Sequence, residues 1–157
     1  MASFPAQNNL HGKWDLYYHL PHDKNWEVSS YSAIMREIDT AEKVILLNDT
    51  IHENIVKNCM LFIMRKGITP LWEDPKNRKG GCFSYKVNNK IVTDCWKSLT
   101  YSLAGESLSK NKNLQEQING ITISPKKNFC IVKIWLANCE YQNAGLIDCT
   151  SGIDAYG

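Results

Sequence analysis

The segment Gly67–Phe83, GITPLWEDPKNRKGGCF, brings together the residue types that would hold a positively charged purine carrying phosphates. Trp72 offers a flat π-surface, and a cation that lies over such a ring is attracted to it. Its neighbour Glu73 is a carboxylate that can accept two parallel hydrogen bonds from an N–H/NH₂ edge such as that of guanine. Three cations follow, at Lys76, Arg78 and Lys79. Glu73 alone, or the three cations alone, would be ordinary solvated loop residues, but together with Trp72 they predict part of a nucleotide site.

Two of the five tryptophans stand in loops rather than on apolar faces. Trp14 and Trp96 lie on apolar periodic faces, which predicts that they are core residues. Trp26 and Trp72 lie in polar loops, where a large apolar ring needs a reason to face water. For these two residues, stacking on a ligand and ordinary packing remain equal alternatives.

Lys133 is a cation in an apolar row. It shares a face of the predicted strand with Phe129, Ile131 and Trp135. A lysine in such a row usually has an anionic partner or marks the edge of a groove, so ligand contact and a snorkelling side chain are equal alternatives. Lys126 and Lys127 fall in a predicted turn, which would expose them in any case.

The composition limits the classes of function. A chain of 157 residues with 43% hydrophobic and 22% charged residues predicts one globular domain. Its net charge of +2 is too small for general polyanion binding, so a contact with nucleic acid should be local and specific. The six cysteines include no C-x-x-C pair and lie far from the histidines in sequence, so neither a metal nor another cofactor is expected.

Compartment is also indicated by the sequence. The N-terminus MASFPAQNNL lacks the apolar stretch of a secretory signal, and the longest apolar run, Cys59–Met64, is too short to span a membrane. We therefore expect a cytoplasmic protein without a membrane partner, whose cysteines are reduced core residues.

The elements that must position the candidate residues follow from local patterns. Alternation predicts a strand over 14–19 and another over 31–38. Asp39-Thr40-Ala41-Glu42 has the pattern of a capping box with Asp39 as N-cap. The helix that follows would bury Val44, Leu47 and Ile51.

The second half of the chain gives further strands and one more helix. Strands are predicted over 59–65, 82–87, 91–93, 118–124 and 128–136, with Asn88-Asn89 as a tight turn. Asp94 would cap a helix that buries Trp96, Leu99 and Leu103 and ends at Gly105. Residues 141–157 give a weak helix-then-strand signal.

Strands dominate this pattern and do not alternate regularly with helices. The arrangement predicts an α+β fold, in which an antiparallel sheet carries helices on one face. Residues 1–9 are expected to form a flexible N-terminal segment and residues 10–157 a single domain.

Several motifs in chain order carry a resemblance to a known family. The most specific is Gly67-Ile68-x-Pro70-x-Trp72-Glu73-Asp74-x-Lys76-Asn77, followed by Gly80-Gly81. The others are Lys13-Trp14, Asn25-Trp26, Asp39-Thr40-Ala41-Glu42, Trp96…Gly105-Glu106 and Ile134-Trp135. Over roughly residues 10–136, the chain resembles the cap-binding proteins of the eukaryotic translation initiation factor 4E family.

The resemblance implies a fold and a ligand. It implies a curved antiparallel β-sheet with two to three helices on its convex face and the 7-methylguanosine cap of messenger RNA in its concave face. Trp26 and Trp72 match the tryptophans that sandwich the methylated base, Glu73 matches the carboxylate that reads guanine, and Trp135 matches the methyl contact. A monomer without catalytic or metal-binding residues is expected.

The predicted phosphate ligands depart from the family pattern. Cys82 stands where the family has an arginine after the Gly-Gly pair. In an alignment without gaps from Gly120 to Trp135, Lys126 falls on the family's phosphate-binding arginine and Ile131 on its lysine. Lys133, two residues further along the same strand face, is expected to replace that lysine. Lys126 and Lys133, together with Lys127, are therefore the predicted phosphate ligands.

The convex face departs as well. The family docks a helical peptide of factor 4G there, and the matching positions before the first strand are Asn8-Asn9. The predicted partner surface consists of Ala41, Ile45, Lys97, Ser98 and Tyr101. A factor 4G-like peptide or another helical peptide would bind it. Such divergence would suit a viral or protist member of the family.

The sequence thus predicts a non-enzymatic protein that binds capped messenger RNA and recruits it for translation initiation. The alternative is a cap-binding translational repressor that does not recruit the usual factor 4G partner. An enzyme such as a cap hydrolase is disfavoured, because the chain has no clustered carboxylates for metal, no P-loop and no paired nucleophile and base.

Overall fold

A computed structural model of the chain describes residues 8–20, 22–143, 146–147 and 154–155. One antiparallel sheet has the strand order β2-β1-β3-β5-β6-β4-β7. Its strands are β1 Asn9–His19, β2 Ser32–Thr40, β3 Met60–Arg65, β4 Cys82–Asn88, β5 Ile118–Pro125, β6 Phe129–Leu136 and β7 Asp154–Ala155. The helices are η1 Val28–Ser30, α1 Ala41–Thr50, α2 Glu53–Asn58, α3 Pro75–Arg78, α4 Val92–Ala104 and α5 Lys112–Gln117.

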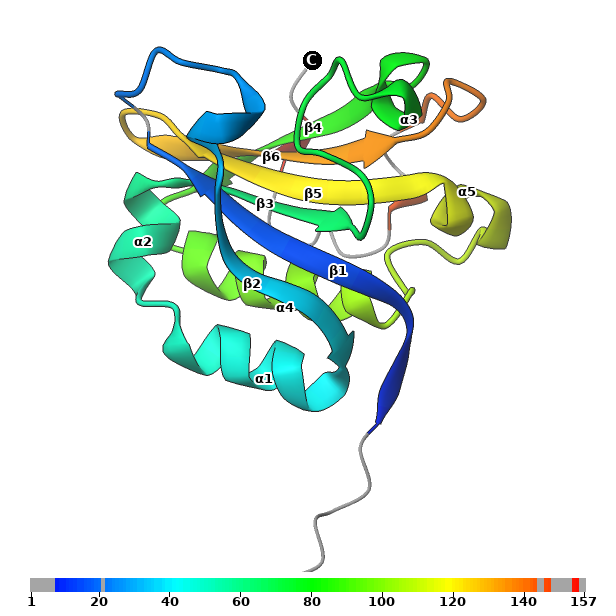
Figure 1. Cartoon of the computed structure of the whole chain (residues 1–157), viewed down its shortest axis with the longest axis horizontal. Coiled ribbons are helices and arrows are strands. Elements are labelled where there is room, and N and C mark those ends of the chain that lie inside the picture. The colour runs from blue at the N-terminus through cyan, green and yellow to red at the C-terminus, as the bar shows by residue number, and fades with distance from the viewer. Residues whose placement is uncertain (1–7, 21, 144–145, 148–153, 156–157) are drawn as a thin grey trace, which may run out of the picture.

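Helices α1, α2 and α4 lie on one side of the curved sheet, and the β1–β2 loop and the segment between β3 and α3 rise on the other side (Figure 1). This arrangement confirms the predicted α+β fold with helices on the convex face.

Alternation along the strands separates two sets of buried side chains. On the convex face, Trp14 and Leu16 of β1 belong to the main core together with Trp96 and Leu99 of α4. Trp14 and Trp96 are each 1% exposed, which confirms them as core residues. On the concave face lies a smaller cluster of Phe62, Met64, Ile68 and Trp135. The concave face is therefore only partly covered by the protein's own side chains.

The strand register aligns the concave side chains in rows. Phe62 lies opposite Thr122, Thr122 opposite Lys133, and Lys133 opposite Ser84. In the neighbouring row, Gly120 lies between Met64 and Trp135. A Cβ atom at Gly120 would lie 2.3 Å from the carbonyl oxygen of Ile63, so this close approach requires glycine.

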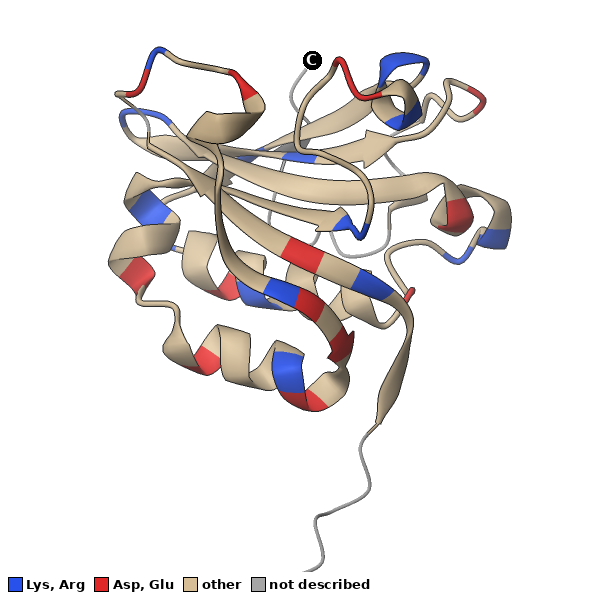
Figure 2. Cartoon of the chain, in the orientation of Figure 1, with Lys and Arg blue, Asp and Glu red and all other residues tan. Residues whose placement is uncertain are grey.

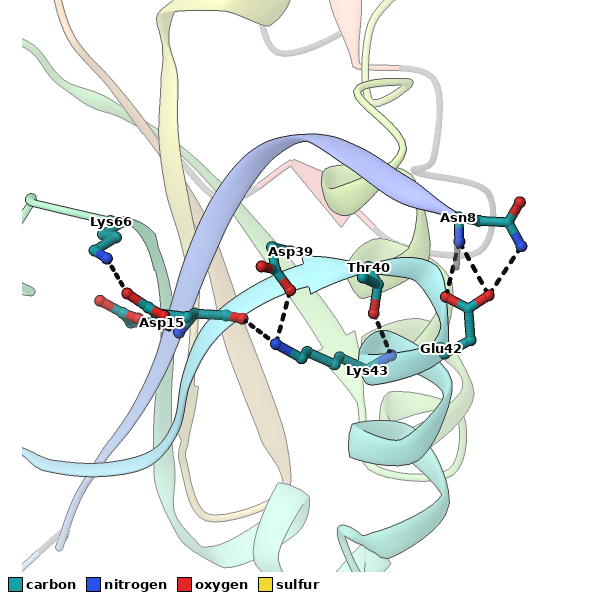
Figure 3. A network of polar contacts seen from close by, with 8 residues as sticks. Asn8, Asp15, Asp39, Thr40, Glu42, Lys43 and Lys66 are labelled. Carbon is teal, nitrogen blue, oxygen red and sulfur yellow. Dashed lines mark hydrogen bonds and ion pairs between the residues drawn. The ribbon is translucent and has the colours of Figure 1, made fainter. Parts of the chain in front are cut away.

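The first helix begins one residue later than predicted. Thr40, not Asp39, is the N-cap, and its hydroxyl accepts a hydrogen bond from the Lys43 N–H at 3.2 Å. Asp39 instead pairs with Lys43 at 2.7 Å, and the Glu42 carboxylate accepts hydrogen bonds from Asn8 (Figure 3). Both Asp and Thr are good N-caps, so the local pattern did not distinguish them. Asp39 remains in β2, where its carboxylate is free to pair.

The predicted apolar face of this helix is partly confirmed. Val44 and Leu47 are buried, whereas Ile51 is the C-cap and only half-buried.

The strand predicted over residues 91–93 is wrong. Ile91 is the N-cap of α4, which begins at Val92, and Asp94 lies in its first turn rather than at the cap. The helix ends at Gly105 as predicted. Three β-branched residues in a row favoured a strand, but burial of Val92 against the sheet outweighed that weak preference.

The predicted β5–β6 hairpin is confirmed, with strands that differ by one residue at their ends. Of the tail, Asp154–Ala155 pairs with β4, and much of the remainder lies outside the described residues. Residues 1–7 of the predicted N-terminal segment also lie outside them, while Asn9 already belongs to β1.

The five described cysteines are free, but they are not all core residues. Cys130 is buried, Cys59, Cys82 and Cys95 are half-buried, and Cys139 is exposed. The prediction for Cys149 lies outside the described residues. None of the described helices is both long enough and apolar enough to cross a membrane.

Candidate functional site

A cavity of about 630 Å³ opens on the concave face. Such a volume is typical of small-molecule sites. The residues predicted from the sequence that line it are Trp26, Trp72, Glu73, Lys126, Lys133 and Trp135. Lys127 is exposed beside Lys126 and is not among the lining residues. We refer to this space as the concave cavity.

Trp72 stands on the loop between β3 and α3 and is 41% exposed. Its ring stacks on Trp135 of β6, with 4.0 Å between centroids and 8° between planes. Trp135 is 3% exposed and belongs to the concave cluster, so it is a fixed support. One face of Trp72 is thus covered by another indole.

Asp74 shapes the loop that carries Trp72. Its carboxylate caps α3 by accepting from the Lys76 N–H, and it also accepts from the N–H and hydroxyl of Thr69, each at 2.8 Å. Burial acts to raise the pKa of Asp74, but these hydrogen bonds outweigh it and hold the pKa below its usual range. Asp74 is therefore a charged anchor of the Trp72 loop.

Asn77 fastens the same loop from inside. It is 1% exposed, and its amide donates to the carbonyls of Thr69 at 3.0 Å and Leu71 at 2.8 Å. Its oxygen accepts from Asn119 of β5 at 2.9 Å. Asn77 thereby ties the residue before Trp72 to the sheet. The motif contained Asn77, but nothing in the sequence pointed to Asn119.

Trp26 is 50% exposed and stands on the β1–β2 loop. Its ring stacks on His19, with 4.1 Å between centroids and 4° between planes. Tyr31 also lines the cavity and lies tilted against both rings. Sequence reasoning missed His19 and Tyr31. The available signal was their position in predicted strands that flank the Trp26 loop.

Glu73 is an exposed residue of the cavity lining, and its negative charge acts on Tyr31, which also lines the cavity. Burial, together with the negative charge of Glu73, raises the pKa of the Tyr31 hydroxyl. The carboxylate therefore acts electrostatically on the cavity wall rather than only on bulk water.

On the sheet, Lys133 of β6 provides positive charge at the cavity. Lys133 is half-buried, and its strand neighbours Thr122 and Ser84, which carry hydroxyl groups, also line the cavity. Ile131 lines it too, which confirms that Ile131, Lys133 and Trp135 share one face of β6. Hydroxyl groups and ammonium groups are suitable partners for phosphate oxygens. The hydroxyls were not predicted, because Ser and Thr are common on every surface.

The cations of α3 and of its C-cap lie apart from the cavity lining. Lys76, Arg78 and Lys79 are exposed and do not line the cavity. Figure 2 shows positive charge at α3 and again at the β5–β6 turn, which carries Lys126 and Lys127. No group of three or more potential metal ligands occurs among the described residues.

Comparison with known proteins decides the family. A family model described as eukaryotic initiation factor 4E matches residues 9–148. The chain belongs to this family. The factor 4E homolog of Acanthamoeba polyphaga mimivirus is 45% identical over 62 residues, which cover 40% of this chain and 23% of that protein.

Longer matches come from cellular members of the factor 4E family. The Candida albicans protein is 26% identical over 156 residues, covering 87% of this chain and 68% of that protein. A structure of C. elegans eIF4E-3 with the 4E-binding protein Mextli has a TM-score of 0.72 and 22% identity, covering 85% of this chain and 78% of that one. Ascaris suum eIF4E-3 with m7G cap has a TM-score of 0.71 and 20% identity, covering 86% and 76%. This chain therefore shares its fold with these two solved structures.

The surface predicted to bind a partner lies on α1 and α4, which pack against each other. Ile45 and Tyr101 are 48% and 44% exposed, Ser98 is exposed, and Ala41 and Lys97 are half-buried. Leu46, next to Ile45, is 53% exposed and was not predicted. The exposed apolar side chains of α1 and α4 at this surface are thus Ile45, Leu46 and Tyr101.

Proposed function

We propose that the protein binds the 7-methylguanosine cap of messenger RNA in the concave cavity and acts in translation initiation. The observation that carries the proposal is the meeting of two exposed tryptophans, one carboxylate and two lysines at a single cavity. Membership of the factor 4E family supports it, as does the m7G cap bound to the Ascaris suum relative.

The two tryptophans supply the selection for methylation. N7-methylation makes guanine a cation, and a cation between two indoles gains about 2 kcal/mol or more when water is excluded. Trp72 and Trp26 each have one face covered, by Trp135 and His19. The methylated base would lie between their remaining faces. In that arrangement Trp135 lies behind Trp72 and supports it, so the methyl contact predicted for Trp135 is not part of the proposal.

Glu73 supplies the selection for guanine. Stacking accepts any base, so identity must come from the hydrogen-bonding edge. A carboxylate accepts from the guanine N1–H and N2–H together, and adenine offers no such pair of donors. The negative charge of Glu73 would also partly neutralise the methylated base.

Lys126 and Lys133 would hold the phosphates, assisted by the hydroxyls of Thr122 and Ser84. Lys133 stands between these two residues in the strand register. It would replace the family lysine whose aligned position is Ile131. Lys127, beside the turn, would add charge without lining the cavity.

We propose recruitment of capped messenger RNA, rather than repression, as the role in translation. Ile45, Leu46 and Tyr101 expose apolar area on α1 and α4, and an amphipathic helical peptide is bound through such area. The C. elegans relative binds the 4E-binding protein Mextli, which supports a protein partner. A factor 4G-type peptide that binds the wild type, and binds Ile45→Ala less well, agrees with recruitment. No binding of the peptide would leave the repressor as the better account.

Binding without catalysis is part of the proposal. Incubation of the protein with 7-methyl-GTP should return the nucleotide unchanged, as judged by chromatography. The appearance of a hydrolysis product would contradict it.

Capped RNA provides the test of function. A short RNA with a 7-methylguanosine cap and the same RNA with a 5′-triphosphate are compared in filter binding at one fixed salt concentration. Retention of the capped RNA, abolished by competing 7-methyl-GTP but not by GTP, is the expected result. Equal retention of the two RNAs would contradict cap binding.

A further inference from the structure

His19 has no role in the family motif, yet it lies directly behind one of the two exposed tryptophans. We propose that His19 is a positioning residue for Trp26, and that with Tyr31 it sets this wall of the concave cavity before a ligand arrives. The inference rests on the proposed cap site and extends it to the residues that orient the site.

His19 and Trp26 form a ring stack. His19 is 0% exposed at the end of β1, where it lies opposite Met60 of β3. Its imidazole is almost parallel to the Trp26 indole, at 4.1 Å between centroids and 4° between planes. A buried ring on a strand therefore covers one face of a half-exposed ring on a loop. The other face of Trp26 is left for a ligand.

The same imidazole also forms a hydrogen bond with the loop that carries Trp26. His19 Nε2 lies 2.7 Å from the carbonyl oxygen of Asn25. A carbonyl oxygen only accepts, so Nε2 carries the proton and donates it. The backbone just before Trp26 is thus held by the side chain on which Trp26 stacks.

The loop itself reinforces this position. The Asp23 carboxylate accepts from the Asn25 N–H, and the Asn25 side chain accepts from the Glu27 N–H, each at 2.9 Å. These local bonds are the kind that fix turns. Trp26 therefore sits between two residues whose backbone groups are both fastened.

Tyr31 connects this wall of the cavity to the sheet. Tyr31 lies 4.9 Å from His19 and 6.4 Å from Trp26 between ring centroids, tilted to both. It meets Phe62 of β3 edge-on, at 5.2 Å and 72°. A chain of rings thus runs from the floor of the cavity to Trp26. Tilted and edge-on contacts of this kind are favourable for aromatic pairs.

Trp26 is therefore already oriented before the ligand binds, and binding does not have to order it. Ordering a side chain and its loop on binding weakens affinity, and pre-orientation removes that loss. Removing the imidazole should therefore weaken binding of 7-methyl-GTP by roughly threefold to tenfold. It should do so even though His19 need not touch the ligand.

The test combines affinity with a view of Trp26 itself. His19→Ala, His19→Phe and the matched control His22→Ala, an exposed histidine of the same loop, are titrated with 7-methyl-GTP. His19→Phe keeps an aromatic ring but loses the bond to Asn25, so an intermediate affinity is expected. Each variant is also combined with Trp26→Ala. In that background His19→Ala should cause no further loss, because there is no ring left to position.

Fluorine NMR on 5-fluorotryptophan protein without ligand gives a second readout, with the Trp26 resonance assigned by its loss in Trp26→Phe. The resonance should shift in His19→Ala and stay in place in His22→Ala. An unchanged resonance, or an equal affinity loss with and without Trp26, would overturn the inference. Failure of the cap proposal looks different: the wild type would then bind GTP as well as 7-methyl-GTP, while the NMR result would still decide the role of His19.

Discussion

At the scale of single residues, the candidate site depends on ring faces that are already covered. Trp72 lies on Trp135 and Trp26 lies on His19, so each exposed indole has a buried or fixed partner behind it. An unsupported indole on a loop would sample many orientations. Two supported indoles leave two defined faces, and Glu73, next to Trp72 in the chain, is the residue proposed to distinguish guanine.

Glu73→Gln tests that assignment. The substitution keeps the shape but replaces one acceptor with a donor, so one of the two bonds from guanine is lost and the other loses its charge. Affinity for 7-methyl-GTP should fall roughly ten- to hundredfold, which corresponds to about 1.5–3 kcal/mol. Fluorescence quenching titrations measure it, with Glu53→Gln on α2 as the control. Equal affinity in wild type and Glu73→Gln would remove Glu73 from the site.

Lys133→Ala tests the relocated phosphate contact. Salt screens the attraction between a lysine and a phosphate, so losing such a contact makes the slope of log affinity against log salt concentration shallower. Affinity for 7-methyl-GTP should fall in Lys133→Ala and in Lys126→Ala, and the salt slope should become shallower. Lys79→Ala, at the C-cap of α3 and outside the cavity lining, is the matched control. Unchanged slopes in both cavity variants would show that these lysines do not hold the phosphates.

At the scale of elements, α3 follows the Trp72 loop, and the structure is held in place at both ends of this helix. Asp74 caps the helix and Asn77 fastens the loop to β5 through Asn119. At the other end, Gly80 lies against β6. A Cβ atom at Gly80 would lie 1.6 Å from the carbonyl oxygen of Leu136, whereas the nearest atom to a Cβ at Gly81 would be 3.8 Å away. The two adjacent glycines therefore carry different constraints.

Gly80→Ala and Gly81→Ala form a matched pair. The first must push β6 away and should lower the free energy of unfolding by about 1–3 kcal/mol. The second meets ordinary van der Waals contact and should change it by less than about 0.5 kcal/mol. Urea unfolding monitored by circular dichroism measures both. Similar losses in the two variants would contradict the close approach at Gly80.

Elements whose residues follow one dominant periodicity could be predicted from the sequence. Details for which two local structures compete, such as two possible N-caps or a helix and a strand, could not. The β5–β6 hairpin and the helix that buries Trp96 follow from strong periodicity. The N-cap predicted for α1 was wrong because both Asp39 and Thr40 are good caps locally. The strand predicted over residues 91–93 was wrong. Their β-branched side chains favour a strand locally, but burial of Val92 in the core favours the helix that begins there.

The site shows the same division. Trp72 and Glu73 were predicted because their types are unusual side by side in a polar loop. His19, Tyr31 and Asn119 act through geometry that is set only when β1, β3 and β5 come together. No local pattern records such a contact, since a histidine at the end of a strand and an asparagine inside one are ordinary on their own.

At the scale of the whole molecule, polar and charged side chains join β2 and α1 to the residues just after β3 and just before β1. Lys66 pairs with Glu37, Lys43 with Asp39, and Asn8 with Glu42 (Figure 3). The hydrogen bond from Lys66 lowers the pKa of Glu37, and that from Lys43 lowers the pKa of Asp39. Backbone N–H groups, its own first and then that of Asn8, lower the pKa of Glu42.

Acid should therefore destabilise this junction. A carboxyl group whose pKa is lowered by folding stabilises the protein above its ordinary pKa, and the stabilisation is lost as pH falls through the lower, folded value. The urea midpoint should be steady near neutral pH and fall below pH about 4. A triple variant, Glu37→Gln, Asp39→Asn and Glu42→Gln, should show a weaker fall. An identical pH profile in the triple variant would show that other groups cause the acid sensitivity.

The central claim is that the concave cavity selects a methylated, positively charged guanine. Isothermal titration of the wild type with 7-methyl-GTP and with GTP, at one pH and one salt concentration, tests it most directly. The account predicts a preference for 7-methyl-GTP of roughly thirtyfold or more, because about 2 kcal/mol of cation–π attraction is present only with the methylated base. Equal affinity for the two nucleotides would contradict it.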